Sequence, residues 1–291
     1  MPSLDLDEMR RQHPDMRGDW TVPQNWQRFT DAEHGVWRTL YRRLIDVLPG
    51  RACDEFLSGL GKLPLDDGIP DFEKLSAVLM KLTGWQVVAV PGLVPDDVFF
   101  EHLANRRFPA GNFIRAADSL DYIEEPDVFH DVFGHVPMLA HPVFADYMEA
   151  YGKGGLRAEG EGTLHNLARL YWYTVEFGLI ETPKGLRIYG SGIASSSAES
   201  VYALEHASPN RIAFDLERVM RTKYRIDDFQ ESYFVIPGFD ALFAETYKDF
   251  AALYRRLATG PTHEAGEIVP EDRVIHRGTR SYRPHSHAAA Q

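Results

Sequence analysis

Cysteine is nearly absent from the 291-residue sequence, and basic side chains are fewer than acidic ones. The single cysteine, Cys53, excludes an intramolecular disulfide and suits a reducing compartment, where we expect it to be a small apolar packing residue. The 31 Lys and Arg residues against 43 Asp and Glu residues give a net charge of −12, which argues against a nucleic-acid-binding or anionic-membrane surface. A solvated acidic surface is the simpler interpretation.

Long apolar runs are also missing. No stretch of about 18 apolar residues occurs, and the N-terminus carries early acids without an apolar segment, so we expect neither a membrane span nor a signal peptide. No GxGxxG fingerprint of a dinucleotide site follows a predicted strand, and no internal repeat is visible. Together with the single cysteine, these absences indicate a cytoplasmic protein.

The residues that are present are typical of a soluble globular enzyme, with 44% hydrophobic and 12% aromatic side chains. The length allows one large domain or two small ones, and we favour one. We expect a flexible arm over residues 1–19, a single folded domain over 20–268, and a disordered polar tail over 269–291.

Apolar spacing predicts a mainly α fold with a few short β-strands. Helices are expected over 31–48, from about 72 to Gly84, from about Pro95, and around 127–133, 142–151, 164–177, 198–206 and 241–257; strands are expected over 85–90, 186–189 and 233–236.

Two histidines, His130 and His135, lie five residues apart in the apolar, acid-flanked segment PDVFHDVFGHVP over 126–137. Neutral imidazole suits iron, copper, nickel or zinc, and a buried polar ring otherwise needs a partner. We therefore interpret the pair as metal ligands. The alternative is that one ring is a core histidine and the other caps a helix.

The spacing differs from the helical HExxH zinc motif, in which the histidines lie four residues apart. On a regular helix five steps of about 100° place the two rings about 140° apart. Both can then reach one ion only from a distorted or terminating turn. Gly134 and Pro137 permit such a turn, because one frees the backbone and the other cannot continue the hydrogen-bond ladder.

Glu176 is the best candidate for a third ligand. The segment 164–180 is apolar nearly all round, which is typical of a buried helix, and its only charges are Arg169 and Glu176. A buried carboxylate is costly unless it is paired or coordinated, so Glu176 is either a ligand or the ion-pair partner of a buried arginine. Two histidines and one carboxylate form the facial triad of non-haem Fe(II) oxygenases.

Three segments together resemble a known family: PDVFHDVFGHVP over 126–137, HPVFADY over 141–147 and YWYTVEFG over 171–178. The sequence is similar, from about Trp20 to about Leu257, to the catalytic domain of the pterin-dependent aromatic amino acid hydroxylases, and among them to the short bacterial phenylalanine 4-hydroxylases. The resemblance implies one Fe(II) bound by His130, His135 and Glu176, a tetrahydropterin co-substrate, O2, and conversion of L-phenylalanine to L-tyrosine.

The resemblance also implies substrate contacts. Arg115 matches the arginine that holds the substrate carboxylate bidentately, although from composition alone it is an ordinary surface arginine. Trp172 and Phe129 match the wall around the substrate ring, although aromatic residues in such numbers are usually core. Ser195 matches a serine that positions a ligand histidine, and Glu199 follows it with a less defined role.

The pterin contacts implied by the resemblance come from a loop, an aromatic ring and an acid. At the amino-acid site, by contrast, Ile123 stands where animal members carry a hydroxyl residue, which affects only a secondary contact. The residues expected at the pterin are Gly92, Leu93, Val94, Phe99 and Asp131.

Ile226 bears on the choice between phenylalanine and tyrosine. Aligned on the Phe-Gln pair that follows it, this residue stands where phenylalanine hydroxylases are apolar and tyrosine hydroxylases carry an acid. An apolar wall leaves a phenolic hydroxyl without a partner, so we expect phenylalanine to be preferred. The alternative is that Ile226 merely packs and that Asp227 and Asp228 are solvated turn residues.

Other functions stay open at this point. A zinc hydrolase would use Asp131 or Glu176 as its base, a metal- or pterin-binding protein without activity is the non-enzyme alternative, and tryptophan or tyrosine hydroxylation is possible within the family. No additional domain precedes Trp20 and no heptad-patterned helix closes the sequence, so we expect a monomer.

Overall fold

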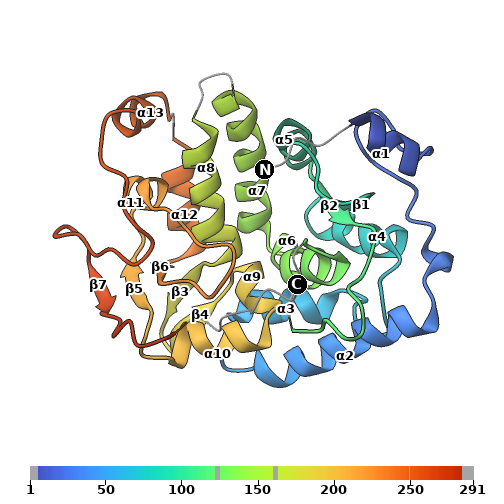
Figure 1. Cartoon of the computed structure of the whole chain (residues 1–291), viewed down its shortest axis with the longest axis horizontal. Helices are drawn as coiled ribbons and strands as arrows, with labels where there is room; N and C mark the ends of the chain where they lie inside the picture. The colour runs from blue at the N-terminus through green and yellow to red at the C-terminus, as the bar shows by residue number, and fades with distance from the viewer. Residues whose placement is uncertain (1–5, 122–124, 160–162, 249, 284–291) are drawn as a thin grey trace, which may run out of the picture.

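The computed structural model describes residues 6–121, 125–159, 163–248 and 250–283. Helices predominate and surround two small sheets, as Figure 1 shows, so the predicted mainly α class is confirmed. No helix among these residues is long and apolar enough to cross a membrane.

The helices are distributed along the whole of the described chain, with strands between some of them. The α-helices are α1 (Leu6–Gln12), α2 (Asp31–Val47), α3 (Asp54–Lys62), α4 (Phe72–Leu82), α5 (Asp96–Ala104), α6 (Val136–Leu139), α7 (Pro142–Glu159), α8 (Leu164–Tyr171), α9 (Ser191–Ala194), α10 (Ser197–Glu205), α11 (Leu216–Arg221), α12 (Phe239–Thr246) and α13 (Ala251–Leu257). A 3-10 turn η1 (Trp26–Arg28) and two π-helices, η2 (Phe129–His135) and η3 (Trp172–Glu176), complete the set.

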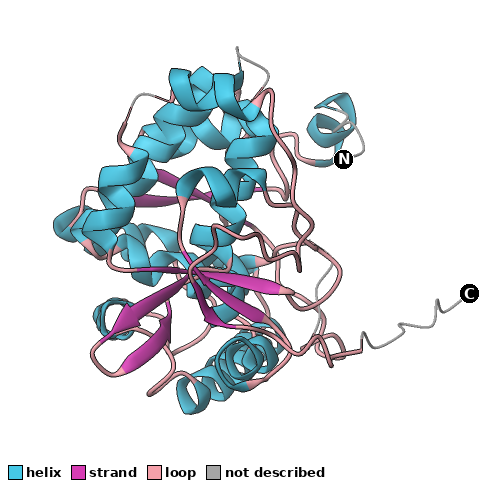
Figure 2. Cartoon of the chain, turned by 90° about the vertical axis from the view of Figure 1, so that its left-hand side faces the viewer, coloured by secondary structure: helices cyan, strands magenta, loops and turns pink. Residues whose placement is uncertain are grey.

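Strands form two separate sheets. The smaller pairs β1 (Gln86–Val90) with β2 (Arg107–Gly111) in parallel. The larger has the order β4-β3-β6-β5-β7, in which β3 to β6 and β6 to β5 are parallel. Its strands are β3 (Leu179–Thr182), β4 (Gly185–Ile188), β5 (Asn210–Ala213), β6 (Ser232–Ile236) and β7 (Val274–His276). Helices lie on both sides of this sheet in Figure 2.

Helix starts are set by side-chain caps. Thr30 and Glu33 form a complete capping box at the start of α2, in which each side chain bonds the other's backbone N–H. Asp71 caps α4 and Ser196 caps α10 in the simpler way, by accepting one backbone N–H. These caps explain why the predicted boundaries of the three helices agree with the structure to within about two residues.

An aromatic core lies directly behind η2. Phe129 and Phe133 stack with ring centroids 4.8 Å apart, and both are fully buried. Trp37 of α2 meets Phe129 edge-on at 4.9 Å, and its indole N–H donates to the carbonyl of Leu65. The apolar face of η2 is therefore held by α2, which leaves its histidines on the opposite side.

Several short elements differ from the sequence-based expectations. Strands β2, β3, β5 and β7 were not predicted, and the helix expected over 241–257 is two helices, α12 and α13. The expected loose arm contains α1, and Asp19 at its end bonds both His102 and Arg107. Disorder from residue 269 is wrong for β7, which pairs antiparallel with β5, and for Tyr282, which packs on Phe229.

Gly59 allows α3 to approach α6 closely, and this contact yields a prediction about stability. A Cβ at Gly59 would overlap the carbonyl oxygen of Pro137, whereas Gly61 on the same helix has open space around it. We expect Gly59→Ala to lower the free energy of unfolding by about 1 to 3 kcal/mol and Gly61→Ala to raise it by about 0.4 to 1 kcal/mol. Urea unfolding of both variants checks this, and equal effects would contradict it.

Candidate metal centre and substrate site

The π-helix η2 resolves the five-residue spacing of the two histidines. Backbone hydrogen bonds of a π-helix join residues five apart, so His130 and His135 lie one above the other on the same face. Their Nε2 atoms are 3.4 Å apart and their rings meet edge-on at 5.2 Å. The distorted turn predicted from the sequence is confirmed, and its form is a wider helix.

Glu176 reaches both imidazoles from the second π-helix, η3. Its Oε1 lies 3.1 Å from His135 Nε2 and its Oε2 lies 3.5 Å from His130 Nε2. Two nitrogens and two carboxylate oxygens thus converge on one point inside the protein. The structure brings together all three residues that the sequence suggested as ligands.

Helix α9 supports these groups. Ser195 Oγ lies 3.0 Å from His130 Nδ1, which turns Nε2 of that ring toward Glu176. Ser191 donates to Glu176 Oε2 at 2.8 Å. Gly134 lets η2 approach this helix, because a Cβ there would lie 2.9 Å from the Ser191 carbonyl oxygen. Sequence reasoning found Ser195 only through the family resemblance and missed Ser191.

Burial and the charges of neighbouring groups together set the protonation of His130 and Glu176. Desolvation lowers the pKa of His130 to about 4, although the charge of Glu176 opposes the shift. Desolvation would raise the pKa of Glu176, but attraction by His135 and His130 outweighs it and the pKa falls to about 2. A neutral His130 and an ionised Glu176 are the forms that bind metal ions.

Asp131 is a second acid beside the histidines, with a ligand atom within 4.8 Å of theirs. Its Oδ2 accepts the backbone N–H of Gly111 at 2.7 Å, at the end of β2. Burial raises the pKa of Asp131 to about 7 despite that hydrogen bond. Of the two acids, Glu176 suits a metal better, because each of its oxygens faces one imidazole while Asp131 is partly engaged by backbone.

Arg115 is buried and forms a two-point ion pair with Asp127. Its Nε and Nη2 lie 2.8 Å from the two oxygens of Asp127, whose pKa is lowered because Arg115 outweighs the effect of burial. Nη1 donates to the carbonyl of Leu120. Three of its five N–H groups are used in this way, so two remain for a ligand carboxylate. A surface position for Arg115 is excluded.

Asp127 also connects the arginine to the metal site. Its Oδ1 accepts the backbone N–H of His130 at 3.0 Å, and its Oδ2 accepts the backbone N–H of Arg115 at 2.9 Å. The carboxylate is fully buried. One side chain therefore fixes both the arginine and the first turn of η2, and sequence reasoning did not identify it.

The two predicted wall aromatics have different surroundings. Phe129 is fully buried between Trp37 and Phe133, so it belongs to the core and exposes no ring to a substrate. This corrects the expectation, because the ring is enclosed by Trp37, Phe133 and the guanidinium of Arg115, whose Cζ lies 5.8 Å from the ring centroid. Trp172 is only partly buried; it stacks on Tyr224 at 4.3 Å and packs near Phe177.

Of the residues expected at the pterin, Asp131 lies beside the histidine pair, and Phe99 is connected to it through Tyr171. Leu93, next to Gly92 and Val94, is exposed, and its backbone N–H donates to Glu125 at 3.0 Å. Phe99 meets Tyr171 edge-on at 5.7 Å, and Tyr171 in turn stacks on His135. The contact between Glu125 and this loop was not predicted from the sequence. Ile123 lies outside the described residues.

Ile226 does not form an apolar wall in this structure. Its side chain is 76% exposed. Arg225 and Asp227 on either side pair with each other at 3.2 Å, which keeps this part of the segment in solvent. The expectation is corrected here because alignment gives the position of Ile226 in the chain but not the direction of the loop.

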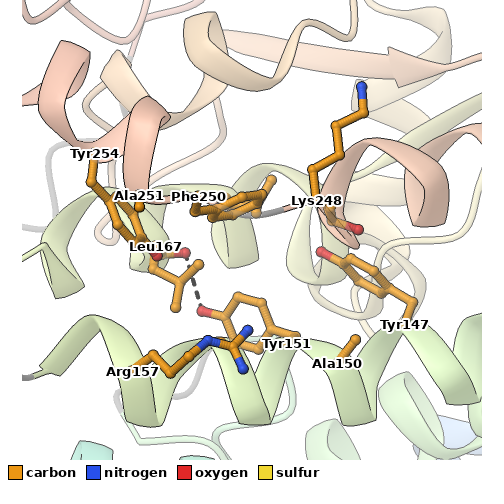
Figure 3. Close-up of a pocket in the computed structure, with 12 residues that line it drawn as sticks. Tyr147, Ala150, Tyr151, Arg157, Leu167, Lys248, Phe250, Ala251 and Tyr254 are labelled. Carbon is orange, nitrogen blue, oxygen red and sulfur yellow. Dashed lines mark hydrogen bonds between the residues drawn. The ribbon is translucent and has the colours of Figure 1, made fainter.

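A separate hollow of about 70 Å³ lies between α7, α8 and the segment that leads into α13, as Figure 3 shows. Tyr151 crosses its floor and donates to the carbonyl of Leu167 at 3.1 Å, with Phe250 and Arg157 at its edges. None of the predicted site residues that the structure describes lines this hollow.

Comparisons with known proteins agree with this geometry. The chain is 65% identical to a phenylalanine-4-hydroxylase of Caulobacter vibrioides over 270 residues, 92% of each protein. It is 62% identical to the phenylalanine-4-hydroxylase of Ralstonia nicotianae, over 91% of this chain and 85% of that protein. The iron- and phenylalanine-bound crystal structure of phenylalanine hydroxylase from Chromobacterium violaceum matches with a TM-score of 0.87 and 56% identity, over 93% of this chain and 100% of that one.

The family assignment rests on most of the sequence. Residues 14–265 match the family model for biopterin-dependent aromatic amino acid hydroxylases, and this span includes both π-helices and Arg115. The chain belongs to the biopterin-dependent aromatic amino acid hydroxylase family.

Proposed function

We propose that this chain is a phenylalanine 4-hydroxylase that converts L-phenylalanine to L-tyrosine with O2 and a tetrahydropterin, using one iron ion held by His130, His135 and Glu176. The observation that carries the proposal is the convergence of these three side chains within 3.1 to 3.5 Å of one another. The relatives named phenylalanine-4-hydroxylase, at 62% and 65% identity, support the choice of substrate.

The donor set fits iron. Two imidazoles and one carboxylate would occupy one face of the metal ion and leave its other coordination positions free, which is the arrangement of non-haem Fe(II) oxygenases. When bound, the iron would supply a site for O2 chemistry and the reduced pterin would supply two electrons. The contacts of Ser195 with His130 and of Ser191 with Glu176 fix the ligand orientation in advance.

The other side chains would bind and orient the amino acid. Arg115 has two N–H groups left after its bonds to Asp127 and Leu120, and these would bind the substrate carboxylate. Trp172, one π-turn before Glu176, would flank the substrate ring. The iron and the reduced pterin would supply the oxygen chemistry, so positioning of the amino acid rather than proton transfer would be the main task of these side chains.

The alternatives are less well supported. Membership of the hydroxylase family argues against a zinc hydrolase, and the names of the most similar relatives found favour phenylalanine over tryptophan or tyrosine.

We also propose that Gly92, Leu93, Val94, Phe99 and Asp131 face the pterin, and that the protein is a cytoplasmic monomer. The single cysteine and the acidic composition support the location.

The first prediction from this proposal concerns the co-substrates. Tyrosine formation from phenylalanine should require Fe(II), O2 and a reduced tetrahydropterin together, because two electrons must come from outside the substrate. Chromatography of reactions that each lack one component checks this. Tyrosine formed at the full rate with NADH in place of the pterin would contradict the proposal.

The second prediction concerns the ligands. His130→Ala, His135→Ala and Glu176→Ala should each remove most bound iron and most activity, because two remaining ligands form an incomplete site. Metal analysis of purified variants measures the iron. His141→Ala is the control, since this half-buried histidine lies outside the triad. Stoichiometric iron in any of the three ligand variants would remove that residue from the site.

The third prediction concerns the substrate carboxylate. Arg115→Lys should raise KM for phenylalanine about tenfold to a hundredfold, since lysine cannot make two parallel bonds to Asp127 and still bind a second carboxylate. KM for the pterin should change much less. Steady-state kinetics with Arg43→Lys, an exposed arginine paired with Asp121, provides the comparison. An unchanged KM for phenylalanine would assign Arg115 a structural role only.

A further inference from the structure

Glu199 is a buried acid that the proposed chemistry does not use. It lies on α10 with 7% of its surface exposed. Its Oε1 accepts the hydroxyl of Tyr233 at 2.6 Å and the backbone N–H of Gln230 at 3.4 Å. Burial raises the pKa of Glu199 to about 7 in spite of these bonds. Burial of an acid is unfavourable unless hydrogen bonds compensate for the lost water, so the partners of Glu199 indicate what it stabilises.

Gln230 connects Glu199 to the substrate site. Its side chain is 1% exposed, and its Oε1 accepts the indole N–H of Trp172 at 2.9 Å. Its amide donates to the backbone carbonyls of Arg225 at 2.9 Å and Asp228 at 3.4 Å. One side chain therefore fixes both the ring of Trp172 and the backbone of the loop over residues 224–230, which we call the site loop.

Tyr282 holds the site loop at a second point. Its hydroxyl donates to Asp228 at 2.8 Å, and its ring packs at 5.4 Å against Phe229. Its backbone N–H donates to Ser208 at 2.9 Å. Tyr282 follows β7, which joins the larger sheet at the edge formed by β5 (Figure 1). The tyrosine lies beyond residues 14–265, the span that matches the family model.

Stacked rings hold the two ends of the site loop, Tyr224 on Trp172 and Phe229 on Tyr202 of α10, whereas its middle has few anchors. Ile226 is largely exposed, and Arg225 pairs with Asp227 and Glu231, its near neighbours in sequence. Segments with few buried contacts open at low free energy. The contacts from Glu199 and Tyr282 therefore add to these stacked rings in holding the loop next to Trp172.

We propose that Glu199 and Tyr282 are positioning residues for the amino-acid site: they fix the site loop at Gln230 and at Asp228 and, through Gln230, the ring of Trp172. The inference rests on the proposed function, because it assigns Trp172 to the wall around the substrate ring. Neither residue touches the substrate. Their effect should therefore appear in the binding of phenylalanine and not in iron content or pterin binding.

The test compares Tyr282→Phe and Glu199→Ala with two matched controls. Tyr282→Phe removes one hydroxyl, and Glu199→Ala removes the acceptor for Gln230. The controls are Ser281→Ala, next to Tyr282, and Glu205→Gln, an exposed acid on the same helix as Glu199. Glu199→Gln keeps an acceptor oxygen and should restore most of what Glu199→Ala loses.

We expect KM for phenylalanine to rise about threefold to tenfold in Tyr282→Phe and Glu199→Ala, the factor associated with a lost hydrogen bond. KM for the pterin and iron content should stay within twofold of the parent. A second measurement does not use activity: limited trypsin digestion of the native protein should cut faster after Arg225 in both variants. The two controls should behave like the parent protein.

Three outcomes are decisive. An unchanged KM for phenylalanine with unchanged cleavage in Tyr282→Phe overturns the inference, even if Glu199→Ala fails to fold. Equal rises in KM for phenylalanine and the pterin, or loss of iron, also overturn it, because they indicate a general structural role. If the parent protein forms no tyrosine at all, the proposed function fails; cleavage after Arg225 then judges the loop anchors separately.

Discussion

The five-residue interval between His130 and His135 is the constraint on which the rest of the site depends. A regular α-helix would separate the two rings by about 140°, and only a π-turn brings Nε2 of one within 3.4 Å of Nε2 of the other. Glu176 also lies in a π-helix, so both ligand-bearing segments depart from regular geometry at the same point. The surrounding structure has to stabilise two wide turns that an isolated chain would not form.

That stabilisation comes from the face of η2 opposite the histidines. Phe129 and Phe133 are stacked and buried, with Trp37 against Phe129. Unwinding the π-turn would expose both rings to water, and the burial of each stabilises the fold by about 1.5 to 3 kcal/mol. On the polar side, Ser191 of α9 bonds the carboxylate, and Ser195, directly after α9, bonds one imidazole. Packing thus maintains the backbone, and hydrogen bonds set the orientation of the ligands.

The sequence predicted the inner part of the site better than the outer part. His130, His135 and Glu176 were found because polar groups in apolar segments need a partner, and that argument requires no tertiary structure. Ser191 was missed because its contact with Glu176 depends on how α9 packs. The direction of Ile226 was wrong because the site loop is anchored by Tyr282, more than 50 residues away. Strands β3 and β5 were missed because each has only four residues, and their burial does not alternate along the strand.

Asp127 shows how the substrate and metal halves of the site are coupled. Its carboxylate pairs with the Arg115 side chain and accepts the backbone N–H of His130, so neither group can shift without disturbing the other. A buried carboxylate without its cation would be strongly unfavourable, which keeps Arg115 in place whether or not a ligand is bound. An arginine that is already oriented loses little conformational freedom when it binds a carboxylate. Because the same carboxylate fixes the first turn of η2, Arg115 and the histidines are held at a constant separation, which would direct the ring of an amino acid bound at Arg115 toward the metal site.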